Sequence, residues 1–176
     1  MKRLLLCLLL VAPSAPLSAQ QPGVDQNSEL LIVPPDEKFL RWHGHTGRTY
    51  FLQFSTGNNP LVDWHWVPII ESGVGLEISY EVGGTEPRGF YRLQYTDEVR
   101  PSGISLEDWD VDGDNLGNLD EVGFYQTNPL AADTDGDGLT DWEEGSYYHT
   151  NPRVRDTDGD GLEDYDEAII YVTDPW

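Results

Sequence analysis

The front half of the chain alternates short apolar runs with turn-forming residues. The runs recur about every eight to twelve residues and end at Gly, Pro or Asn, as at Pro34-Pro35. Over Leu76–Val82, apolar residues occupy every second position, which indicates a strand with one wet face. The pattern predicts strands near residues 30–33, 39–42, 50–54, 64–69, 76–82 and 90–95. We therefore expect a mainly β module, a small antiparallel sandwich, over residues 30–96.

The amino terminus has the layout of a secretory signal peptide. Two basic residues precede an apolar run, Leu4–Ala12, and small residues follow up to Ala19. The apolar run is too short to span a bilayer as a stable helix. We expect residues 1–19 to be removed, residues 20–29 to be flexible, and the protein to be exported to the extracellular space, the cell surface or the periplasm. The single cysteine, Cys7, would leave with the signal peptide.

Aromatic side chains of the β module are candidates for ligand binding. Trp42, Trp64 and Trp66 could form a platform for sugar rings, or they could belong to the core, because Trp is highly buried on average. We favour the core and keep the platform as the alternative.

Three acidic segments in the back half align without a gap. They begin at Asp110, Asp133 and Asp156, so the period is 23 residues. A constant period over three units indicates stacked or strung modules. We therefore divide the region into repeats 110–132, 133–155 and 156–176, behind a linker at 97–109. The match extends beyond the acidic part to Tyr125, Tyr148 and Tyr171, to Thr127, Thr150 and Thr173, and to Pro129, Pro152 and Pro175.

The spacing of oxygen donors within each segment is that of a calcium loop. Counted from the first Asp, carboxylates at positions 1, 3 and 5 lie inside a tight loop, and Gly at position 6 allows the turn. The carbonyl of position 7 and the side chain of position 9 add oxygens, and Glu at position 12 closes the site. Because all donors are hard oxygens, we expect about three Ca²⁺ ions rather than magnesium, zinc or copper. The predicted ligands are Asp110, Asp112, Asp114, Leu116, Asn118, Glu121, Asp133, Asp135, Asp137, Leu139, Asp141, Glu144, Asp156, Asp158, Asp160, Leu162, Asp164 and Glu167.

Two details of the loops lead to further expectations. The first loop has Asn115 at position 6, and Asn tolerates left-handed backbone better than most residues. The other two loops end in adjacent acids, and consecutive side chains on a helix point about 100° apart. We therefore expect Glu144 and Glu167 to be bidentate ligands, while Glu143 and Asp166 point to solvent.

The negative charge is concentrated in the repeats. The formal net charge is −22, and residues 107–176 hold 21 acidic and 2 basic side chains, against 11 and 6 in residues 20–106. Such acidity excludes nucleic-acid binding through phosphates. Repulsion within the loops means that metal binding must supply the folding free energy of the repeats. We expect the repeats to expand without calcium while the β module keeps its fold.

The segment Asp-Thr-Asp-Gly-Asp-Gly-Leu-x-Asp, present at 133–141 and 156–164, resembles the thrombospondin type 3 calcium repeat in its bacterial version. Animal members of that family tie their repeats together with cysteines, which this chain lacks after Cys7. The resemblance covers residues 110–176 and implies single-helix modules wrapped around ions, with little regular structure. Dockerin modules are the nearest rival family. The β module loosely resembles small fibronectin-III-like sandwiches.

These features predict a secreted, calcium-binding structural or adhesion-type protein, whose β module is held by a calcium-stiffened tail. The alternative is a carbohydrate-binding module with a calcium-dependent spacer or a dockerin-like docking tail. A cell-surface protein or a polysaccharide would be the partner. No nucleophile–base pair and no Gly-rich phosphate loop occurs, so we expect no enzyme activity and no catalytic residues.

Overall fold

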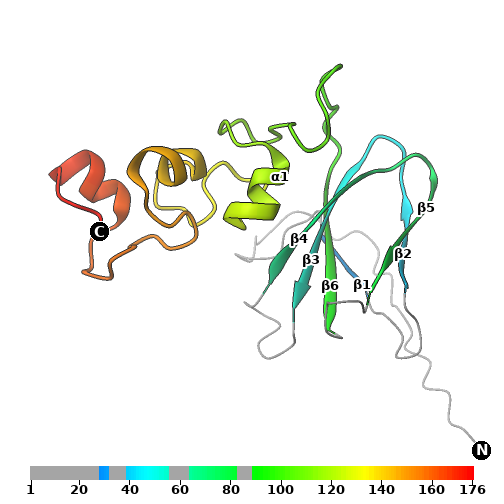
Figure 1. Cartoon of the computed structure of the whole chain (residues 1–176), viewed down its shortest axis with the longest axis horizontal. Coiled ribbons are helices and arrows are strands. Elements are labelled where there is room, and N and C mark those ends of the chain that lie inside the picture. The colour runs from blue at the N-terminus through cyan, green and yellow to red at the C-terminus, as the bar shows by residue number, and fades with distance from the viewer. Residues whose placement is uncertain (1–27, 32–38, 56–63, 83–88) are drawn as a thin grey trace, which may run out of the picture.

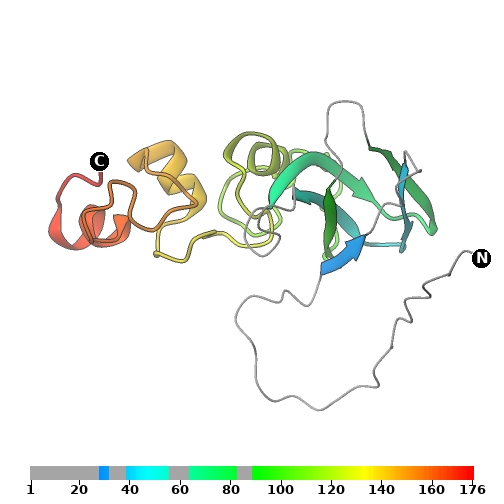
Figure 2. The ribbon, with the colours of Figure 1, turned by 90° about the horizontal axis from the view of Figure 1, so that it is seen from below.

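The computed structural model describes residues 28–31, 39–55, 64–82 and 89–176 (Figure 1). The predicted signal peptide lies outside these residues. The chain forms a β module followed by a row of three loop-and-helix units that extends away from it (Figures 1 and 2).

In the described residues, the β module contains six antiparallel strands in two sheets. One sheet has four strands in the order β1-β6-β3-β4, and the other pairs β2 with β5. Each predicted apolar run overlaps one of these strands, with residues 32–33 of the first run outside the described residues, so the predicted antiparallel β module is confirmed. The strands are β1 (Ser28–Leu31), β2 (Phe39–Gly44), β3 (Thr49–Ser55), β4 (His65–Ser72), β5 (Leu76–Glu81) and β6 (Phe90–Thr96).

A hydrophobic core fills the space between the two sheets. Along β2, Leu40 and Trp42 are buried while their neighbours on the strand are exposed, as expected for a strand with one face on the core. Trp42 packs edge-on against Tyr50, with ring centroids 6.2 Å apart. The core comprises Leu40, Trp42, Tyr50, Leu52, Phe54, Val67, Tyr91 and Leu93.

Strand β3 is buried along its whole length, because the four-stranded sheet is covered on both faces. On the outer face, Phe51 and Trp66 pack against Val122 of the first repeat, with Val111 and Leu130 beside them. We call this group the junction cluster. The first repeat is therefore packed on the β module, and the expectation that the module folds independently of the repeats does not fit this packing. Residues 97–109 remain the predicted linker between the two parts.

A side-chain amide fixes the same contact. Gln126 accepts a hydrogen bond from the backbone N–H of Trp66 (2.8 Å) and donates one to the carbonyl of Trp66 (3.2 Å). Strand β4 is an edge strand, so Gln126 satisfies the two backbone groups that an added strand would otherwise use.

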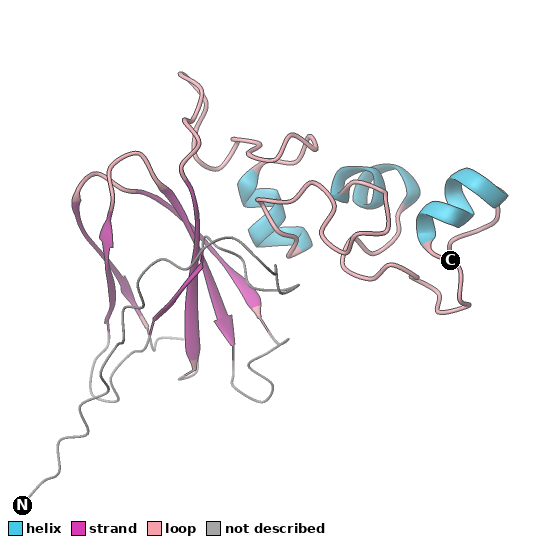
Figure 3. Cartoon of the chain, turned by 180° about the vertical axis from the view of Figure 1, so that it is seen from behind, coloured by secondary structure: helices cyan, strands magenta, loops and turns pink. Residues whose placement is uncertain are grey.

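Each repeat consists of an acidic loop and one short helix (Figure 3). The first helix begins as α1 (Asn118–Asp120) and continues as a π-helical turn, η1 (Glu121–Tyr125). The other two π-helical segments are η2 (Glu143–Tyr148) and η3 (Asp166–Tyr171). Each ends at a residue with left-handed backbone: Gln126, His149 and Val172 have φ of 60°, 63° and 54°. The predicted architecture of irregular repeats with short helices is confirmed. Within the described part of the chain, no helix is long and apolar enough to cross a membrane.

Candidate metal centres

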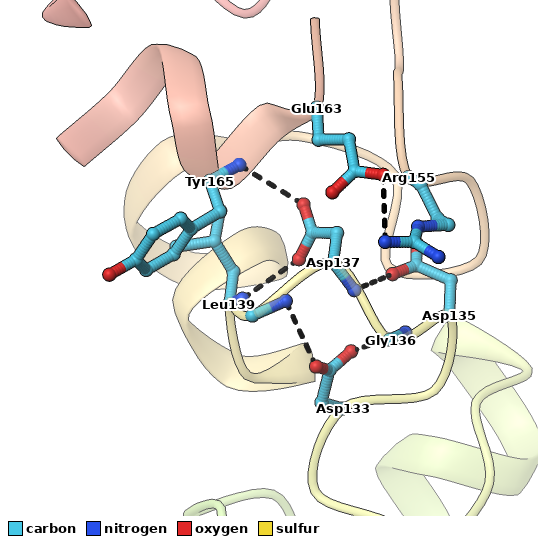
Figure 4. A network of polar contacts seen from close by, with 9 residues as sticks. Asp133, Asp135, Gly136, Asp137, Leu139, Arg155, Glu163 and Tyr165 are labelled. Carbon is cyan, nitrogen blue, oxygen red and sulfur yellow. Dashed lines mark hydrogen bonds and ion pairs between the residues drawn. The ribbon is translucent and has the colours of Figure 1, made fainter. Parts of the chain in front are cut away.

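The first Asp of each loop shapes the backbone around the site. Asp133 accepts hydrogen bonds from the N–H groups of Gly136 (2.7 Å) and Gly138 (3.0 Å), one on each carboxylate oxygen (Figure 4). Asp156 binds Gly159 and Gly161 in the same way. These bonds close the chain into the tight loop that the spacing predicts.

Position 6 requires left-handed backbone in all three loops. Gly138 and Gly161 have φ of 112° and 105°, and Asn115 has φ of 82°. Asn115 donates its N–H to Asp110 just as the glycines donate to their own first Asp. The first loop therefore keeps the conformation of the other two, as expected from the tolerance of Asn for this region.

The aspartates at positions 1, 3 and 5 converge in every loop. In each loop, one oxygen from each of the three carboxylates lies within 4.8 Å of the others. This spacing suits three oxygens around one cation. The converging sets are Asp110, Asp112 and Asp114, then Asp133, Asp135 and Asp137, then Asp156, Asp158 and Asp160.

The glutamates at position 12 are buried. Glu121 and Glu144 are 0 % exposed, and Glu167 is 2 % exposed. Both carboxylate oxygens of Glu121, and one oxygen each of Glu144 and Glu167, have no hydrogen-bond partner. A buried carboxylate without a partner is strongly unfavourable, so these side chains fit a site that a cation completes.

A threonine holds each of the last two closing glutamates in place. The Oγ of Thr150 donates to Glu144 (3.1 Å), and the Oγ of Thr173 donates to Glu167 (3.0 Å). The sequence showed these threonines as constant repeat positions but not their role, because a hydroxyl six residues after an acid has no local signature.

Burial and mutual repulsion raise the pKa values of four acids in the first two loops. Burial is the larger cause, and the neighbouring carboxylates add to it. The pKa of Glu121 rises to about 10, that of Glu144 to about 9, that of Asp112 to about 7 and that of Asp135 to about 6. Without a cation, Glu121 and Glu144 are therefore much more easily protonated than ordinary glutamates.

The two adjacent glutamates of the second loop have different surroundings. Glu143 accepts hydrogen bonds from the N–H (2.9 Å) and Oγ (3.2 Å) of Thr140, whose Oγ accepts one from the N–H of Glu143. This is a capping box, which closes the start of the helix. We expected Glu143 to point to solvent, but it is half-buried and its carboxylate is hydrogen-bonded in the cap.

The aspartate at position 9 of the third loop lies close to the preceding loop, which the pattern of a single loop does not predict. Asp164 is fully buried, and its carboxylate lies within 4.8 Å of oxygens from Asp137 and Glu144 of the preceding loop. The first repeat has Asn118 here, and its amide donates to the carbonyl of Leu106 (2.8 Å). The pattern of one loop contains no signal for this arrangement, because it depends on how two repeats pack.

The remaining candidates of the sequence analysis are placed as follows. The carbonyls of Leu116, Leu139 and Leu162 at position 7 stay predicted ligands. Trp42 lies in the core and Trp66 in the junction cluster, each 7 % exposed and on opposite faces of the four-stranded sheet. Trp64 is half-buried beneath Arg92, whose guanidinium carbon is 4.5 Å from the ring centroid. The three rings therefore do not form an exposed sugar platform.

Comparison with known families gives one finding. The sequence model of the bacterial TSP3 repeat matches residues 133–152 and 156–175. Comparison with curated proteins and with solved structures finds no match for the chain, so the likeness of the β module to fibronectin-III sandwiches has no support from them. The second and third repeats, with their acidic loops and single short helices, are bacterial TSP3 repeats, a calcium-binding type of extracellular structural repeat.

Proposed function

We propose that the chain binds three calcium ions, one in each acidic loop, and that the ions fold the repeats into a stiff extension of the β module. The observation that carries this proposal is the closing glutamate. In Glu121, a carboxylate without hydrogen-bond partners is completely buried beside three converging aspartates. A cation bound among these carboxylates would stabilise its ionised form there.

The donor set favours calcium among the divalent cations. Each loop offers oxygen donors alone, with no His or Cys, so zinc and copper lack their preferred ligands. Calcium accepts six to eight oxygens in flexible geometry, whereas magnesium requires a nearly ideal octahedron and retains several waters. Four carboxylates and a carbonyl in one loop therefore suit calcium better than magnesium.

The role that we propose is structural and extracellular. A signal peptide would export the protein, and outside the cell even sites with dissociation constants of about 10⁻⁴–10⁻³ M would stay filled. The filled repeats would hold the β module at a fixed distance and direction, as an adhesion-type or spacer protein requires. A cell-surface protein or polysaccharide would be the partner, and we propose no enzyme activity.

The test is a count of bound ions and a pair of matched variants. Native mass spectrometry of the intact protein should give three calcium ions. Glu144→Gln should weaken one site at least about tenfold, because it removes the charge of a closing ligand. Glu143→Gln should leave calcium binding nearly unchanged, because Gln also forms a capping box. A count of zero or one, or a larger effect of Glu143→Gln, would contradict the proposal.

A further inference from the structure

The repeats are linked by the residues that follow each loop. The backbone N–H of Tyr165, in the third repeat, donates to the Oδ2 of Asp137 in the second loop (3.1 Å; Figure 4). The equivalent N–H of Trp142, in the second repeat, donates to the Oδ2 of Asp114 in the first loop (3.1 Å). The start of each of these two helices therefore contacts the loop of the repeat before it.

The position-9 aspartate precedes that N–H by one residue, and its carboxylate lies in the same boundary. Asp137, Glu144 and Asp164 are all buried, and one oxygen of each lies within 4.8 Å of the other two. In the boundary before it, Asp141 is fully buried, directly before the Trp142 N–H that binds Asp114 of the first loop. One oxygen of Glu144 lacks a hydrogen-bond partner, as both do in Glu121, so each boundary contains a buried carboxylate that fits a cation.

We propose that Asp141 and Asp164 are ligands of the calcium ion in the preceding loop, so that the second and third repeats each complete the site of the repeat before them. The inference rests on the proposed calcium binding. It replaces the prediction that each loop is completed by its own position 9.

The first repeat supports this assignment, because it differs from the other two repeats at positions 9 and 2. Its position 9 is Asn118, and no acidic loop precedes it in the described part of the chain. The side-chain N–H of Asn118 donates to the carbonyl of Leu106, a hydrogen bond that a carboxylate could not make. Position 2 of the first repeat is Val111, which packs in the junction cluster. In the other two repeats position 2 is a threonine. Its N–H and Oγ both donate to the position-9 aspartate, Thr134 to Asp141 and Thr157 to Asp164.

The same hydrogen bonds leave room for a cation. Each carboxylate oxygen of Asp164 accepts one hydrogen bond from Thr157, at 2.9 and 2.7 Å. A carboxylate oxygen has two lone pairs, so each retains one for the ion. Thr157 thus fixes the direction of Asp164 toward the second loop.

The experiment is a calcium titration of the intact protein by amide NMR, with glycine resonances as site-specific reporters. The amides of Gly136 and Gly138 report the second loop, and those of Gly159 and Gly161 report the third, because each donates to the first Asp of its loop. In Asp164→Asn, the midpoint for the second loop should rise at least about tenfold, since loss of a supporting residue alone costs 10- to 100-fold at metal sites. The midpoint for the third loop should stay within about twofold.

Matched variants complete the test. Asp141→Asn should move the midpoint of the Gly113 amide in the first loop and leave the second loop unchanged. The control Asp166→Asn removes the same charge beside a closing glutamate and should change neither loop. Asn118→Asp should not raise the calcium affinity of the first loop. It would raise that affinity if the position-9 residue were a ligand in its own loop. An unchanged Phe51 amide reports that the β module remains folded.

The results separate the two claims. If no glycine amide of the wild-type protein responds to calcium, the proposed function itself is wrong. If the wild type responds but Asp164→Asn affects the third loop, both loops equally or neither, the cross-repeat assignment is overturned while calcium binding stands.

Discussion

Removal of calcium should destabilise the β module as well as the repeats, because the junction cluster is shared between them. Phe51 and Trp66 each have one face covered by the first repeat. A buried aromatic side chain covers about 200 Å², so loss of that cover would expose about 100 Å² on each ring. At about 25 cal/mol per Å², the two rings together lose about 5 kcal/mol of burial.

That loss is comparable to the whole stability of a small domain. For a domain of this size, a loss of 1 kcal/mol lowers the melting temperature by about 4–8 °C. Chelation should therefore lower the melting temperature of the β module by about 20 °C or more. Thermal unfolding followed by far-ultraviolet circular dichroism at strand wavelengths, with calcium and with chelator, measures this shift. Tryptophan emission at 25 °C should move to the red on chelation, and Trp66→Phe should reduce that change.

A matched pair of variants tests the same coupling with calcium present. Val122 is fully buried in the cluster, while Phe124 on the same helix is 78 % exposed. Val122→Ala should cost about 2 kcal/mol, and Phe124→Ala should cost little. If chelation leaves the melting temperature of the β module unchanged, or if the two variants behave alike, the coupling argued from this packing is refuted.

Three further outcomes are expected. In chelator, acidification from about pH 9 to pH 5 should make the repeats more compact in small-angle scattering. Because the pKa values of Glu121 and Glu144 are raised in the folded state, the metal-free loops gain stability as the pH falls below about 9 and lose it as the pH rises. Expansion of the repeats on acidification would contradict this. Gln126→Ala should lower the unfolding free energy by about 2 kcal/mol in a denaturant titration, because two hydrogen bonds to Trp66 are lost, and an unchanged midpoint would show that the contact is not needed. Gly145→Ala should destabilise the boundary of the first two repeats by about 1–3 kcal/mol, because the added Cβ would clash with the ring of Tyr125. In thermal unfolding, the double variant with Tyr125→Leu should recover part of that loss.

Much of this arrangement follows from the sequence by local rules. Apolar runs and turn residues locate the six strands, since strand formation and chain reversal depend on residues close together in the chain. The loops are located by the spacing of acids and glycines, and Asn115 adopts the left-handed backbone that position 6 requires.

The contacts between units could not be predicted in this way. Val122 is one apolar residue in a short helix, and nothing near it in sequence indicates that it packs on Phe51 and Trp66. Asp164 fits the pattern of its own loop, but its carboxylate faces the previous one because of how the helices stack. Glu143 and Glu144 are both acids at the start of a helix, and only the capping contact with Thr140 distinguishes them.

The hydrogen bonds of Gln126 also bear on how the protein behaves in crowded or calcium-poor solution. Strand β4 is at the edge of its sheet, and unpaired backbone groups on such an edge can recruit strands from other molecules. While the first repeat is docked, Gln126 occupies the N–H and carbonyl of Trp66 and the edge is blocked at this residue. Release of the repeat would free that edge beside two newly exposed aromatic rings, which together form an aggregation-prone surface. The docked repeat thus blocks this edge against self-association, and the proposed calcium ions would preserve that protection by holding the repeat in place.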